Sequence, residues 1–177
     1  MKLPKDFGEL TVREFQQVSK IMDSEDDLLD KYVNVIACLS GKDIKEIESN
    51  TFGKIGEWFK QVSFIQRPYA PENYSKWVFV NGRFYKPVVN NENFLASQLI
   101  SLKFLDEKKQ PIELLNQLLA CCYVRMNWLG KPLPYNAKDH NQIAEDMLDV
   151  KLKHVYGFLM FKKKVLLLKK STTPDIP

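Results

Sequence analysis

The pattern of apolar and polar positions divides the chain into two helical stretches with a β-rich stretch between them. Apolar residues recur at helical spacing through residues 11–64 and again through residues 93–168. Between them, residues 76–88 are rich in aromatic and β-branched residues and are centred on Asn81-Gly82. Asn-Gly is well suited to a two-residue hairpin turn, because both positions adopt a positive φ. The pattern therefore predicts a mostly α fold, with two helical subdomains joined by one β-hairpin.

The boundaries of these parts follow from helix caps and prolines. Thr11 and Glu14 form a capping-box pattern, and Gly41 is a typical helix stop. Pro68 and Pro71 end the first helical stretch, because a proline disfavours helix at the residue before it. We expect an N-terminal helical subdomain over residues 1–70, a linker and hairpin over 71–90, a C-terminal helical subdomain over 91–170 and a flexible tail over 171–177.

The second helical stretch predicts several helices in turn. One begins near Asn93, and a second, with Pro111 in its first turn, carries apolar residues as far as Tyr123. A third begins near Asp139, and the last begins near Lys151. The two halves also resemble each other. When Cys38 is placed over Cys121, Ile36-Ala37-Cys38-Leu39 falls on Leu119-Ala120-Cys121-Cys122. Either an internal duplication or the general likeness of amphipathic helices explains this match.

Composition narrows the class of protein. The chain has 177 residues, of which 45% are hydrophobic and 12% aromatic, so it can bury a substantial core. Its net charge of +4 does not require a nucleic-acid partner. Three cysteines within apolar helical patterns indicate reduced, buried thiols in a cytosolic setting. We expect no signal peptide and no membrane span, because no uncharged apolar run is long enough.

The sequence contains no recognisable catalytic, cofactor-binding or metal-binding pattern. The two histidines, His140 and His154, do not have the spacing of a zinc motif. Cys121 and Cys122 are adjacent, which differs from the C-x-x-C spacing of redox sites. We therefore predict a non-enzymatic protein with no catalytic residues, cofactor or metal. An enzyme of unknown type would need carboxylates from separate helices to meet in a pocket.

The C-terminal end carries an uneven distribution of charge. From Lys151 to Lys170 there are seven lysines and no acidic residue. Such a run suits a solvated helix face, an acidic protein partner, or a phosphate backbone bound without sequence preference. Lys162, Lys163 and Lys164 are the candidate contacts in this run.

The order of elements resembles small structural or assembly proteins of tailed bacteriophages. The residues that carry the resemblance are Leu10-Thr11-Val12-Arg13-Glu14-Phe15, Leu39-Ser40-Gly41-Lys42-Asp43-Ile44, Val80-Asn81-Gly82-Arg83-Phe84-Tyr85-Lys86 and Pro134-Tyr135-Asn136. The chain looks most similar to proteins of the tail-module region of crAss-like phages, such as tail assembly chaperones and portal- or tail-proximal virion proteins. The resemblance implies a virion protein, or one present in the host cytoplasm during assembly. It implies no catalytic residues.

These observations lead to one functional prediction and one alternative. We expect a virion structural or assembly protein, in several copies, that contacts portal, tail or ring proteins and no membrane. A lone hairpin is marginal in water, so its apolar side chains should pack on the helices or extend a neighbouring subunit's sheet. The candidate contact residues in the hairpin are Trp77, Phe79, Arg83 and Tyr85. The alternative is a nucleic-acid-associated packaging or cargo protein that uses the lysine-rich end.

Overall fold

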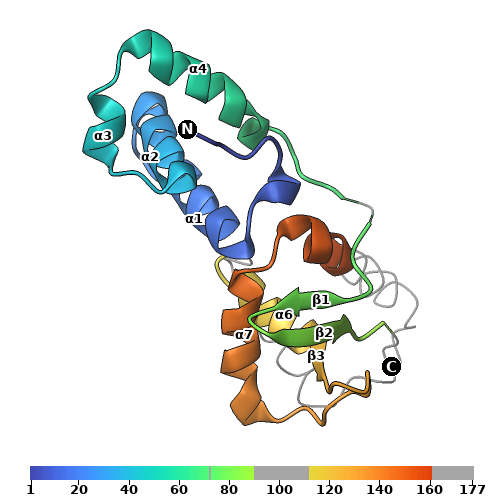
Figure 1. Ribbon diagram of the computed structural model, residues 1–177. Helices are drawn as coiled ribbons and strands as arrows, with labels where there is room; N and C mark the ends of the chain where they lie inside the picture. Colours follow the sequence, from blue (N-terminus) through green and yellow to red (C-terminus); the bar gives the residue numbers. More distant parts are fainter. Residues whose placement is uncertain (72, 90–111, 161–177) are drawn as a thin grey trace, which may run out of the picture.

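Four helices form the first part of the structure, a computed structural model that describes residues 1–71, 73–89 and 112–160 (Figure 1). They are α1 (Val12–Met22), α2 (Leu28–Ser40), α3 (Ile44–Glu48) and α4 (Phe52–Val62). A short 3-10 turn, Phe7–Glu9, precedes α1, and another, Ser63–Gln66, follows α4. The predicted helix at Asn93, most of the lysine-rich run and the predicted tail lie outside the described residues.

The caps that the sequence predicts are present in this part. The Thr11 hydroxyl accepts a hydrogen bond from the Glu14 backbone N–H, and the Glu14 carboxylate accepts one from the Thr11 backbone N–H at 2.7 Å. Asp27 caps α2, and Gly41 ends it with a φ of 67°. These contacts satisfy backbone groups that a helix end leaves open, and so they fix where α1 and α2 begin and end.

Three antiparallel strands follow, in the spatial order β1-β2-β3. Strands β1 (Val78–Val80) and β2 (Arg83–Pro87) form the predicted hairpin. Its turn has Asn81 at a φ of 48° and Gly82 at 73°, as a type I′ turn requires. The mostly α fold and its hairpin are therefore confirmed.

The third strand corrects the sequence prediction. Helix α6 (Leu115–Cys122) ends before Tyr123, and β3 (Tyr123–Met126) pairs with β2. The predicted helix was therefore too long by its last residue, and the hairpin is not an isolated ribbon. The physical reason is the open edge of β2, whose unpaired backbone groups β3 covers. The proposed duplication stays a prediction: α2 ends at a glycine, whereas α6 continues directly into a strand.

The chain then returns to the first helices. Helix α7 (His140–Leu148) begins close to the predicted Asp139, and residues 152–160 form a further helix. Between them, the Val12 N–H donates to the Val150 carbonyl at 2.9 Å, and the Leu152 N–H donates to the Leu10 carbonyl at 2.8 Å. This short backbone bridge fastens the start of α1 to the end of α7.

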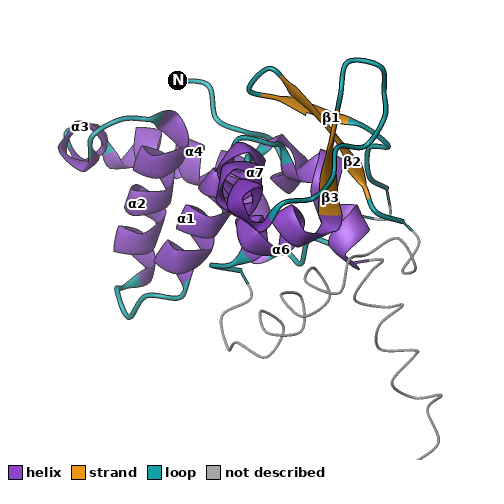
Figure 2. Cartoon of the chain, turned by 90° about the horizontal axis from the view of Figure 1, so that it is seen from below, coloured by secondary structure: helices purple, strands orange, loops and turns teal. Residues whose placement is uncertain are grey.

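Buried side chains from both parts of the chain join one hydrophobic cluster. It includes Phe15 and Tyr32 from the first helices, Tyr85 from β2, and Leu119 and Phe158 from the second half. Helices α6 and α7 pack on each other, and Figure 2 shows the strands at one side of these helices. No helix in the described residues is long and apolar enough to cross a membrane.

Candidate docking surface

A buried carboxylate on α7 anchors the hairpin. Asp146 is only 1% exposed, and its oxygens accept hydrogen bonds from the Arg83 guanidinium at 3.0 and 3.1 Å. The Tyr85 hydroxyl donates to the same carboxylate, and the Asn81 amide donates to it at 3.2 Å. A fourth donor, the Gln142 amide, lies one helical turn away at 3.2 Å. Three residues of one hairpin therefore converge on one acid.

The charges in this cluster compensate one another. Burial alone would raise the pKa of the Asp146 carboxyl, but hydrogen bonds from Tyr85 and Asn81 and the charge of Arg83 hold that pKa below its usual value. Burial, together with the bond to Asp146, raises the pKa of Tyr85 far above neutral pH. Tyr85 is therefore a neutral donor and Asp146 a charged acceptor. A hydrogen bond to a charged acceptor is stronger than one between two neutral groups.

The anchor decides which face of the hairpin is exposed. Side chains alternate along a strand, so fixing Tyr85 and Val78 inward turns their neighbours outward. Val78, Val80 and Tyr85 are buried, whereas Phe79 is 63% exposed, Phe84 48% and Trp77 46%. We call Trp77, Phe79 and Phe84 the aromatic face. Of the two expected arrangements, packing on the helices therefore holds for Tyr85 and not for the three exposed rings, while extension of a neighbouring subunit's sheet stays a prediction.

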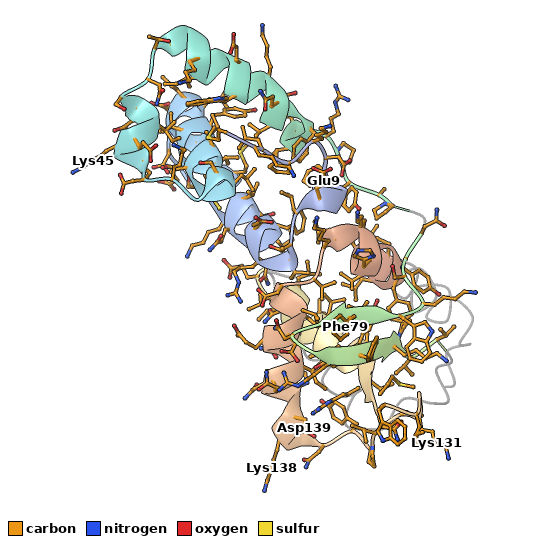
Figure 3. The ribbon with its side chains drawn as sticks, viewed as in Figure 1. Glu9, Lys45, Phe79, Lys131, Lys138 and Asp139 are labelled. Atoms are coloured by element: carbon orange, nitrogen blue, oxygen red, sulfur yellow. The ribbon has the colours of Figure 1, made fainter. Side chains whose placement is uncertain are left out.

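The aromatic face is ordered by contacts among its own residues. Phe79 and Phe84 are cross-strand partners, and their ring centroids are 4.6 Å apart. The Lys86 ammonium lies 5.5 Å from the centroid of the Trp77 ring, a cation–π contact. Figure 3 places Phe79 on the hairpin, away from Lys45 of α3 at the other end of the molecule.

A tight loop after β3 extends the apolar surface. The Asn127 side chain accepts hydrogen bonds from the backbone N–H groups of Leu129 and Lys131, at 3.0 and 2.9 Å. This loop leaves Trp128 89% exposed and Leu129 57% exposed. It also reaches the aromatic face, because a Cβ on Gly130 would lie 4.0 Å from the Trp77 ring. Large apolar side chains are thus exposed on the hairpin and on this loop.

The surroundings of the aromatic face are positively charged. Residues 73–89 and 123–136 contain no aspartate or glutamate. They contain three exposed lysines, Lys76, Lys86 and Lys131. Arg125 is exposed as well, but it is the cross-strand partner of the inward-facing Tyr85 and so lies on the opposite face of the sheet. Arg83 is also present, but its charge is neutralised by an ion pair with Asp146. No salt bridge to these lysines occurs among the described residues, so the surface combines exposed aromatic rings with positive charge.

The predicted contact residues fall into three groups. Trp77 and Phe79 lie together on the exposed face. Arg83 and Tyr85 point the other way, onto Asp146, and Tyr85 is fully buried, so in this structure they support the surface and do not form it. Lys162, Lys163 and Lys164 lie outside the described residues.

Sequence reasoning missed Asp146 and Trp128. The sequence gives no sign that Asp146 is buried, because a single acidic residue in an amphipathic helix usually faces solvent. Trp128 stands in a segment recognisable as a loop, but its exposure depends on how Asn127 folds that loop.

The histidines and cysteines of the described residues belong to the packed interior or to local hydrogen bonds. His140 bonds through Nε2 to the Gln117 side chain at 2.7 Å and through Nδ1 to the Tyr135 hydroxyl at 2.8 Å. Burial raises the pKa of the Cys121 thiol to about 11, so it is protonated at neutral pH. Within residues 1–71, 73–89 and 112–160, no three His, Cys, Asp or Glu side chains are placed to hold a metal ion.

Comparisons with known proteins identify no relative of the chain. No protein-family model, no curated protein and no solved structure matches the chain.

Proposed function

We propose that this protein is a non-enzymatic docking subunit of a tailed-phage particle, or of its assembly, and that it binds other proteins through the aromatic face. The observation that carries the proposal is the exposure of Trp77, Phe79 and Phe84 on a hairpin that is hydrogen-bonded to Asp146. The phage setting, with portal, tail or ring proteins as partners, comes from the resemblance of the sequence.

The energetics favour a binding role for this face. Fully burying a large apolar side chain gains roughly 1.5–3 kcal/mol, so covering the three partly exposed rings offers several kcal/mol of binding free energy. Aromatic residues are also the residue type that most often dominates protein interfaces. The Asp146 anchor holds the hairpin before any partner arrives, which lowers the ordering cost of association.

A retention experiment in infected cells tests the proposal. The tagged wild type is compared with Phe79→Ser/Phe84→Ser and with Phe52→Ser as a matched control. Phe52 is 78% exposed but lies on α4, away from the sheet (Figure 1). We expect phage structural proteins to be retained by the wild type and by the control, and to be lost with the double variant. Equal retention by all three, or retention of no structural protein by any, would contradict the proposal.

The nucleic-acid alternative makes a different prediction. A protein that neutralises phosphates loses affinity steeply as salt rises, because bound counterions are released. Its candidate residues, Lys162, Lys163 and Lys164, lie outside the described residues, so the alternative stays a prediction of the sequence. Retention of DNA that falls with salt and disappears when these lysines are neutralised would favour it.

A further inference from the structure

A second surface of the chain matches the aromatic face in chemistry. The turn between α1 and α2 and the first residues of α2, Glu25–Asp30, are all exposed. We call this segment the acidic turn. It contains Glu25, Asp26, Asp27 and Asp30, and it also exposes two leucines, Leu28 at 58% and Leu29 at 51%. It therefore presents apolar side chains surrounded by negative charge.

The acidic turn is held in shape by local hydrogen bonds. The Asp27 carboxylate caps α2 by accepting from the N–H groups of Leu29 and Asp30, at 2.8 and 3.1 Å. The Ser24 hydroxyl bonds the Asp26 carboxylate and the Ile21 carbonyl, each at 2.8 Å. These contacts fix the backbone while leaving both leucines in water. The two adjacent leucines at this capped helix start therefore form a small apolar surface whose backbone is already ordered before a partner binds.

We propose that the aromatic face of one copy binds the acidic turn of a second copy. Leu28 and Leu29 would cover the exposed rings of Phe79 and Phe84, and the surrounding carboxylates would meet the exposed cations beside the face. Those cations are Lys76, Lys86 and Lys131. The inference rests on the proposed function, because it names the occupant of the same face. Complementary charge also orients the two copies and disfavours face-to-face pairing, since like charges would then oppose each other.

The placement of the two surfaces makes the contact head-to-tail. In Figure 2, the turn joining α1 to α2 lies at the lower left, whereas the β1–β2 hairpin lies at the upper right. One copy therefore cannot cover its own aromatic face with its own acidic turn. Each added copy leaves one free surface of each kind, so the contact generates a ring if the rotation closes and an open chain if it does not.

Two complementary variants test this contact in the purified full-length protein. The face variant is Phe79→Ser/Phe84→Ser, and the turn variant is Glu25→Lys/Asp30→Lys. Neither acid of the turn variant contributes its side chain to a hydrogen bond or an ion pair within the described residues. The matched charge control is Glu48→Lys/Glu57→Lys, which reverses two exposed acids on other helices. Size-exclusion chromatography with light scattering gives the mass of each sample.

We expect the wild type and the charge control to exceed the monomer mass of 20.7 kDa increasingly as concentration rises. Each surface variant alone should stay monomeric. Mixing the face variant with the turn variant should give a heterodimer and nothing larger, because the pair retains a single intact contact. A wild type that stays monomeric would overturn the inference, as would larger oligomers in the mixture or a turn variant that assembles like the wild type. Such a result would leave the proposed function standing if the face variant still lost its phage partners in the retention experiment.

Discussion

The Tyr85 hydroxyl donates a hydrogen bond to the Asp146 carboxylate, joining the middle strand of the sheet to α7 across 61 residues of sequence. Both side chains are buried, and Tyr85 alternates along β2 with the exposed Phe84. The same contact that holds the hairpin therefore also turns the aromatic face outward. Changes at the anchor should affect the stability of the fold, and changes at the face should affect binding.

Removing the hydroxyl of Tyr85 should destabilise the protein. Tyr85→Phe keeps the ring in the core but takes one of the donors from the Asp146 carboxylate. A hydrogen bond to a charged group typically contributes about 1.5–3 kcal/mol, and we expect a loss of that size in the free energy of unfolding. Urea unfolding measures it. An unchanged midpoint and slope would show that the bond contributes nothing to stability.

The equivalent change at Tyr123 should not destabilise the protein. Its hydroxyl is buried, with no hydrogen-bond partner among the described residues. An unsatisfied buried polar group costs about 1–3 kcal/mol, so Tyr123→Phe should stabilise the fold or leave it unchanged. The same urea measurement applies. A loss of stability comparable to that of Tyr85→Phe would mean that the Tyr123 hydroxyl has a partner after all.

Lowering the pH should reduce the stability that the Asp146 carboxylate contributes, and comparison with a variant at this position can assign the effect to Asp146. The folded-state pKa of Asp146 lies below its usual value of 3.8, so its contribution to stability is complete above that value and is lost as pH falls through the folded-state pKa. The Asp146→Asn variant lacks this titration. The difference in unfolding free energy between wild type and variant should therefore be largest near neutral pH and should shrink below about pH 4. A difference that stayed constant, or grew in acid, would contradict the assignment.

Two glycines in helices should respond differently to alanine. A Cβ on Gly157 would lie 2.3 Å from the Asn73 carbonyl oxygen, so Gly157→Ala must displace the segment leading into β1. Gly56 in α4 has open space around it, and alanine there should stabilise by about 0.5–1 kcal/mol through its higher helix propensity. Thermal unfolding of both variants gives the comparison. The prediction fails if Gly157→Ala is as stable as Gly56→Ala.

Local sequence signals predicted most of the elements because their causes are local. The Thr11–Glu14 capping box, the Gly41 stop and the Asn81-Gly82 turn each depend on residues only a few positions apart. The strand β3 depends instead on pairing with β2, which lies about 40 residues earlier. The four residues Tyr123–Met126 alone do not indicate which strand they pair with.

The candidate surface was predictable only in part for the same reason. The alternation of the hairpin shows that its two faces differ, but not which one is buried. Asp146 decides this, and its partners Arg83 and Tyr85 could be recognised as important without knowing that they point inward. Trp77 and Phe79 could therefore be predicted as contact residues from their aromatic side chains, whereas the exposure of Trp128 is evident only from the folded loop.

Hydroxyl-radical footprinting tests the central claim most directly, because it reports the exposure of individual side chains. The free protein is compared with the protein recovered in phage assemblies, with Phe52 as the internal reference. We predict that Trp77, Phe79 and Phe84, which are exposed in the free chain, become protected in the assembly while Phe52 changes little. Equal labelling of Phe79 and Phe84 in both samples would contradict a docking role for this face.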